Sequence, residues 1–199
     1  MVSGRRYGAV VMGASAGGME ALMAVLSPLP VDHRLPILVV QHLHPADDGQ
    51  LAALLDRQLA VRVVAARDKQ AVRAGTVHIA PADYHLLVER DWTLALSVDE
   101  RVCWSRPSID VLFDSAARAW GRSLVGVVLS GANHDGAAGL RQIGQFGGLT
   151  VVQRPESAAH PVMPRAAIAA GPVAEVLDPP AIGRLLARLG RPHASAGVE

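Results

Sequence analysis

The chain has 199 residues, of which 50% are hydrophobic, so it can bury the core of one globular domain. Its 19 lysines and arginines nearly balance its 18 aspartates and glutamates, and no run of basic residues marks a surface for nucleic acid, so a nucleic-acid partner is not expected. Because Cys103 is the only cysteine, an intrachain disulfide is excluded and a cytoplasmic protein is expected.

The N-terminal region predicts neither a signal peptide nor a membrane anchor. Its apolar run is interrupted by Gly13, Ser15, Gly17, Gly18 and Glu20, which is unlike the core of a signal peptide. Apolar stretches elsewhere are far shorter than the roughly 18 residues that a bilayer-spanning helix needs. Membrane insertion is therefore not expected.

Short β-branched runs alternate with amphipathic stretches along the chain. The predicted strands, in chain order, are residues 7–12, 37–40, 61–65, 76–80, 124–129 and 149–152. The predicted helices are residues 19–26, 50–59, 109–120 with Ser108 as N-cap, 137–146, 164–170 and 180–189. Segments 84–89 and 92–97 predict an antiparallel hairpin around Arg90 and Asp91.

Strands that alternate with helices form right-handed βαβ units. We therefore predict an α/β fold with three α/β/α layers, whose doubly wound sheet is mainly parallel and is accompanied by one antiparallel hairpin. One domain is expected over residues 1–190, with a flexible tail at 191–199. In such sheets ligands bind beyond the carboxyl ends of the strands, which draws attention to loops 13–18, 41–49 and 130–136.

The first loop presents Ser15 on a turn between a strand and a helix. Its glycines allow a tight bend, and the helix N-terminus beyond offers N–H donors to a developing oxyanion. Ser15 is therefore a candidate nucleophile, although ordinary helix capping also accounts for such a turn. A dinucleotide site is disfavoured, because Ser15 takes the place of the middle glycine and Gln41-His42 stands where a ribose-binding acid is expected.

The second loop supplies His42, directly after a predicted strand. A histidine at the same sheet end as Ser15 can act as a general base, because its unperturbed pKa lies near neutrality. A backbone-bound loop histidine is the alternative. His42 and His44, with carboxylates nearby, also fit a zinc site, although no third histidine follows at close spacing.

The third loop supplies Asp135, directly before a predicted helix. Asp is a favoured N-cap, so capping of that helix explains this residue by itself. Three strand ends that deliver Ser15, His42 and Asp135 to one edge of one sheet are nevertheless what a catalytic triad requires. Their order in the chain differs from that of α/β-hydrolases, which disfavours that family.

Six ordered segments together resemble the CheB methylesterase family, from about Gly8 to Leu189. The segments are Gly13-Ala14-Ser15-Ala16-Gly17-Gly18, Gln41-His42, Ile79-Ala80-Pro81, Arg106-Pro107-Ser108-Ile109-Asp110-Val111-Leu112-Phe113, Asp135-Gly136-Ala137-Ala138-Gly139 and Met163-Pro164-Arg165.

The resemblance implies Ser15 as nucleophile, His42 as base and then acid, and Asp135 as the group that orients His42. It implies hydrolysis of γ-glutamyl methyl esters on chemoreceptors, deamidation of receptor glutamines by the same acyl-enzyme, and no cofactor or metal. The family's receptor-linked enzymes usually carry an N-terminal receiver domain. None is expected within these residues, because the first strand begins within the first ten.

The chain departs from the family pattern around the pocket. Ala16 stands where a threonine is frequent, and Ser130-Gly131-Ala132-Asn133 replaces Thr-Gly-Met-Gly. We expect Ala16, Gly17 and Ala132 to form the oxyanion and substrate loops of a pocket that differs from the family's. Two alternatives stay open: a metal-dependent hydrolase built on His42 and His44, and an inactive binding or adaptor domain.

Overall fold

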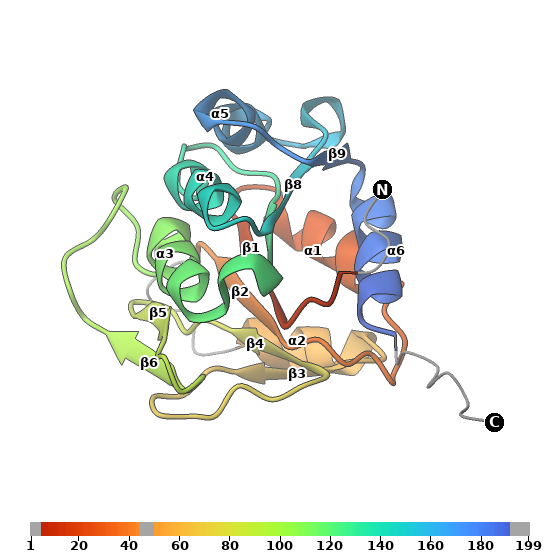
Figure 1. Cartoon of the computed structure of the whole chain (residues 1–199), viewed down its shortest axis with the longest axis vertical. Helices are drawn as coiled ribbons and strands as arrows, with labels where there is room; N and C mark the ends of the chain where they lie inside the picture. The colour runs from red at the N-terminus through yellow and green to blue at the C-terminus, as the bar shows by residue number, and fades with distance from the viewer. Residues whose placement is uncertain (1–4, 44–49, 192–199) are drawn as a thin grey trace.

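The computed structural model describes residues 5–43 and 50–191, and its centre is a seven-stranded sheet (Figure 1). Neighbouring strands follow the order β3-β4-β2-β1-β7-β8-β9, and every pairing is parallel. The predicted doubly wound, parallel sheet is thus confirmed. The strands are β1 (Ala9–Ala14), β2 (Ile37–Gln41), β3 (Arg62–Ala65), β4 (Thr76–Ile79), β7 (Leu124–Val128), β8 (Leu149–Gln153) and β9 (Glu175–Leu177).

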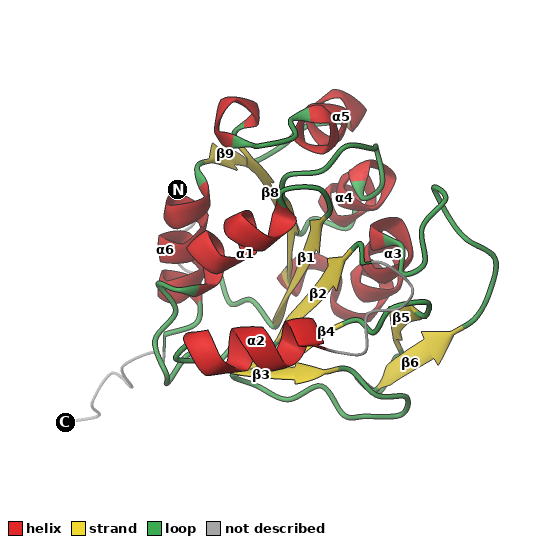
Figure 2. Ribbon diagram, turned by 180° about the vertical axis from the view of Figure 1, so that it is seen from behind, coloured by secondary structure: helices red, strands yellow, loops and turns green. Residues whose placement is uncertain are grey.

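Helices cover both faces of the sheet, which gives the three predicted layers (Figure 2). One face packs against α1 (Gly18–Leu26), α2 (Gln50–Gln58) and α6 (Pro179–Leu189). The other packs against α3 (Ile109–Trp120), α4 (Ala137–Gln145) and α5 (Val162–Ala170). Alternate residues of β1 point to opposite faces of the sheet. Met12 packs in the core beneath α1 and α6, Val11 packs in the core beneath α3 and α4, and both are fully buried.

A separate antiparallel pair, β5 (His85–Val88) and β6 (Leu94–Ser97), confirms the predicted hairpin. Its Leu86 and Leu94 are fully buried in the core beneath α3. The edge strand β9 was not predicted from the sequence. It has three half-buried residues, too few to show a hydrophobic alternation.

The strand order reverses at β1, because the chain first adds β2 on one side and later β7 on the other. The carboxyl ends of these three strands lie together at this switch point, where α/β proteins bind ligands. Gly13 brings the start of α3 onto this edge: a Cβ at Gly13 would lie 2.3 Å from Cγ2 of Ile109. Glycine therefore permits the close approach of α3 to the end of β1.

Some predictions reach beyond the described residues. Positions 44–49 of the second loop, with His44, lie outside them, as does all of the predicted tail except Arg191. Within the described ranges, no helix combines the length and the hydropathy that crossing a bilayer requires.

Candidate active site

Ser15 lies on the turn between β1 and α1, and its side chain faces the end of β2. The turn is fixed by two backbone hydrogen bonds: the Ser15 N–H donates to the carbonyl of Ser130 at 2.9 Å, and the Gly18 N–H donates to the carbonyl of Ser15 at 2.8 Å. Gly17 precedes α1 with a φ of 70°, which glycine adopts without strain. Ser15 is thus a half-buried hydroxyl beside a helix N-terminus.

His42 follows β2 and contacts both other residues of the predicted triad. Its Nδ1 lies 3.1 Å from Oγ of Ser15, and its Nε2 lies 2.9 Å from Oδ2 of Asp135. A proton on Nε2, donated to Asp135, leaves the lone pair of Nδ1 directed at the serine hydroxyl. In this tautomer the ring has the arrangement that a general base for Ser15 needs.

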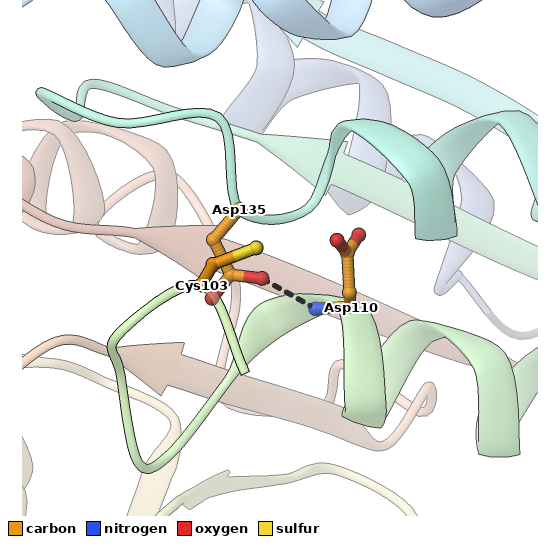
Figure 3. A group of neighbouring side chains, drawn as sticks. All are labelled: Cys103, Asp110 and Asp135. Carbon is orange, nitrogen blue, oxygen red and sulfur yellow. Dashed lines mark hydrogen bonds between the residues drawn. The ribbon is translucent and has the colours of Figure 1, made fainter. Parts of the chain in front are cut away.

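Asp135 is fully buried, and it caps a different helix from the one that follows it. The N-cap of α4 is Gly136, whereas the Asp135 carboxylate accepts the N–H groups of Ile109 at 2.7 Å and Asp110 at 3.0 Å, at the start of α3 (Figure 3). Oγ of Ser108 donates to the same carboxylate at 2.9 Å. The alternative explanation, that Asp135 caps α4, is therefore wrong, because its carboxylate binds the first amides of α3.

These donors also set the charge of Asp135. Burial by itself would raise the pKa of its carboxyl group, but the hydrogen bonds from His42 and from the amides of Asp110 and Ile109 outweigh burial and lower the pKa. Asp135 is consequently a carboxylate at neutral pH. A buried negative charge next to Nε2 would stabilise an imidazolium at His42.

Gln41 joins the loops of Ser15 and His42, and sequence reasoning gave it no role. Its buried side-chain Nε2 donates to the carbonyl of Ser15 at 2.9 Å and to that of His42 at 3.1 Å. Gly18 leaves room for this amide, because a Cβ there would lie 2.2 Å from Oε1 of Gln41. The Gln41-His42 pair was visible in the sequence, but a catalytic role was predicted for His42 alone.

The predicted oxyanion loop lies beside the serine. Oγ of Ser130 donates to the carbonyl of Ala16 at 2.8 Å, which fixes the peptide plane between Ala16 and Gly17. Within the described residues, the N–H groups of Ala16 and Gly17 have no hydrogen-bond acceptor. Ala132 is exposed on the loop after β7. The main-chain N–H groups of Ala16 and Gly17 are therefore the candidate donors to an oxyanion at Ser15.

Cys103 also lies at this site, although the sequence gave no reason to place it there. Its Sγ lies 3.6 Å from Nε2 of His134, and it forms a cluster with carboxylate oxygens of Asp110 and Asp135 in which the atoms are within 4.8 Å of one another (Figure 3). Burial raises the pKa of the Cys103 thiol, and the two carboxylates raise it further. The thiolate is therefore disfavoured.

The geometry gives the metal alternative little support. Both ring nitrogens of His42 are already engaged, and each oxygen of Asp135 accepts two hydrogen bonds. Oδ1 of Asp110 accepts the N–H of Gly139 at 2.7 Å. A metal at this cluster would have to displace several of these bonds, and His44 lies outside the described residues.

Several known proteins are similar to this chain in sequence and in fold. A family model described as CheB methylesterase matches residues 10–186. A "putative protein-glutamate methylesterase/protein-glutamine glutaminase" of Leptospira interrogans is 44% identical over 92% of this chain and 95% of its own length. A protein-glutamate methylesterase/protein-glutamine glutaminase of Symbiobacterium thermophilum is 38% identical over 90% of this chain and 49% of its own length.

The crystal structure of the Thermotoga maritima CheB methylesterase catalytic domain matches the fold with a TM-score of 0.88. It is 30% identical in sequence, and the match covers 93% of this chain and 100% of that one. Sequence and structure therefore agree along nearly the whole chain. The chain belongs to the CheB methylesterase family.

Proposed function

We propose that this protein is a serine hydrolase that removes methyl groups from γ-glutamyl methyl esters of chemoreceptors or related sensory proteins. The observation that carries the proposal is the pair of contacts made by His42, with Ser15 on one ring nitrogen and Asp135 on the other. Relatives named as protein-glutamate methylesterases support this substrate class.

In the first half-reaction, Oγ of Ser15 attacks the ester carbonyl carbon while Nδ1 of His42 takes the hydroxyl proton. The main-chain N–H groups of Ala16 and Gly17 donate to the oxyanion that develops. When the tetrahedral intermediate collapses, the bond to the methoxy oxygen breaks. His42 returns its proton to that oxygen, so methanol leaves and an acyl-enzyme remains on Ser15.

In the second half-reaction, water attacks the acyl carbon and gives a proton to His42. Collapse breaks the bond to Oγ, His42 reprotonates Ser15, and the glutamate side chain leaves as the carboxylic acid, which loses its remaining proton to solvent. A glutamine side chain can follow the same route, with ammonia leaving in place of methanol. This is the deamidase activity that the relatives' names include.

The proposal needs no cofactor or metal, because each proton and each bond is handled by the three side chains and water. We propose that the protein acts in the cytoplasm on a methylated sensory protein. Residues 1–190 are proposed to form one catalytic domain. Ala132 and the exposed loop that carries it are proposed to line the substrate pocket. The adaptor alternative predicts the same fold without turnover.

Methanol release from a methylated chemoreceptor fragment tests the proposal. Ser15→Ala is expected to lower turnover by at least about 10³-fold without unfolding the protein, since it removes one half-buried hydroxyl. Ser27→Ala at the other end of α1 is the matched control and is expected to keep wild-type turnover. Near-normal methanol release by Ser15→Ala would refute the nucleophile, and loss of activity to a chelator with recovery on zinc would favour the metal alternative.

A further inference from the structure

A long loop between β6 and α3 reaches the edge of the sheet that carries the triad, and it appears light green in Figure 1. Its start is held by Arg106, which donates to the carbonyls of Val98 and Asp99 at 2.6 and 3.1 Å and is paired with Asp83 at 2.9 Å. The loop is therefore anchored to the body of the protein.

The buried side chain of His85 ties the middle of this loop to the active site. Its Nδ1 accepts the N–H of Ser108 at 3.1 Å, so its Nε2 carries the proton and donates to the carbonyl of Glu100 at 3.0 Å. Ser108 in turn donates its hydroxyl to Asp135 at 2.9 Å. One chain of hydrogen bonds thus links the loop to the Asp135 carboxylate.

The tip of the loop is a tight turn that presents a tryptophan to solvent. Val102 and Ser105 exchange both backbone hydrogen bonds, and the two residues between them, Cys103 and Trp104, have φ values of 50° and 63°. Such a turn favours Asn and Gly, and bulky residues are strained in it. Trp104 is 92% exposed, so the protein holds a large apolar ring in water on a strained turn.

The turn that carries this ring lies next to Asp135 of the candidate triad. The residue before Trp104, Cys103, belongs to the cluster whose ligand atoms lie within 4.8 Å of one another and include a carboxylate oxygen of Asp135 (Figure 3). Val98 and Val102 on the same loop are 66% and 37% exposed. Three exposed apolar side chains thus lie on the loop whose tip reaches Asp135, and none of them packs into either described core cluster.

We infer that Val98, Val102 and Trp104 form a docking surface for the protein substrate, with Trp104 contacting an apolar side chain close to the esterified glutamate. The inference rests on the proposed function, because it takes a methylated protein as the occupant. A rigid, exposed tryptophan is the type of residue that contributes most to protein recognition when it becomes buried. A small ester has no such side chain and would not need this surface.

The test compares two substrates and two tryptophans. Trp104→Ala is expected to lower kcat/KM for a methylated chemoreceptor fragment at least about tenfold, mainly through KM, while hydrolysis of p-nitrophenyl acetate stays within about twofold of wild type. Trp92→Ala is the matched control, since Trp92 is 56% exposed and has a φ of 62° in the turn between β5 and β6. This variant is expected to match wild type on both substrates.

The possible results separate the two proposals. Wild-type kcat/KM for Trp104→Ala on the receptor fragment would overturn the docking surface, and so would an equal loss on both substrates, which indicates distortion of the triad. A wild-type protein that releases no methanol from the fragment would instead refute the proposed function. Recovery of receptor activity in Trp104→Phe would support an aromatic contact.

Discussion

Asp135 and Asp110 cap each other's helices. Asp135 precedes α4, yet its carboxylate accepts the N–H of Asp110 in the first turn of α3 at 3.0 Å. Asp110 belongs to α3, yet its carboxylate accepts the N–H of Gly139 in the first turn of α4 at 2.7 Å. The exchange fixes the two helix starts against each other, and it holds the group that binds His42 at a defined place.

Asp135→Asn is expected to lower turnover by at least about 10²-fold, because a neutral amide stabilises no imidazolium and does not hold the tautomer of His42. It is also expected to lower the free energy of unfolding by about 1–3 kcal/mol, since one amide oxygen replaces two acceptors and an NH₂ group faces N–H donors. Methanol release and urea titration measure the two effects.

Asp110→Asn is the matched control for this change. The amide oxygen can still accept the N–H of Gly139, and the side chain of Asp110 makes no hydrogen bond to His42 within the described residues. Turnover close to wild type is expected. If Asp135→Asn kept wild-type turnover and melting temperature, Asp135 would have no catalytic role and would serve only as a helix cap that Asn can replace.

Gln41→Leu is expected to lower kcat about tenfold with little change in KM, because it removes the two hydrogen bonds that position Ser15 relative to His42. The exposed Gln58→Leu at the end of α2 is the control. Steady-state rates measured over a range of substrate concentrations for each variant give kcat and KM separately. An increase in KM alone would show that Gln41 serves binding and not the alignment of the triad.

Cys103→Ser is expected to keep wild-type turnover, and iodoacetamide is expected to modify Cys103 slowly at pH 7. The reason is the raised pKa of the thiol, caused by burial and by the carboxylates of Asp135 and Asp110, which leaves little reactive thiolate. Mass spectrometry over time measures the modification. Rapid alkylation that inactivates the enzyme, with protection by substrate, would contradict this expectation.

His78 is expected to make the fold sensitive to acid. Burial lowers its pKa from 6.5 to about 4, so between these values the unfolded chain binds a proton that the folded protein does not. The free energy of unfolding should therefore fall by up to about 3 kcal/mol as the pH drops through this window. Burial also lowers the pKa of His33, which acts in the same direction.

Urea titrations at pH 7 and pH 5 test this expectation. His78→Gln keeps an acceptor for the N–H of Arg73 but does not titrate, so the loss of stability between the two pH values should be smaller than in wild type. Part of the loss should remain, because His33 is still present. The same loss in variant and wild type would show that His78 does not carry the effect.

Local sequence patterns predicted most of the fold because they act over short distances. Unbroken apolar runs such as residues 37–40 indicate buried parallel strands, and the glycine turn at Gly17 marks the start of α1. The carboxyl ends of parallel strands meet at one edge, so the approach of Ser15, His42 and Asp135 could also be predicted.

Contacts between distant segments could not be predicted in the same way. Asp135 caps α3 and not α4 because of how the two helices pack. The hydrogen bond from Ser108 to Asp135 joins residues that are 27 positions apart in the chain. Cys103 lies near Asp135 because of the path of the long loop between β6 and α3, and no periodic sequence pattern encodes that path. Ser108 was correctly predicted as the N-cap of α3, but its hydroxyl donates to Asp135 and makes no cap bond.

Covalent labelling by a serine-directed phosphonate tests the central claim most directly, because only an activated serine displaces the leaving group of such a reagent. We predict stoichiometric modification of the intact protein at Ser15, loss of methanol release in parallel with labelling, and no labelling of the Ser15→Ala or Asp135→Asn variants over the same period. An active protein that stays unlabelled, or that is labelled at a residue other than Ser15, would contradict the account.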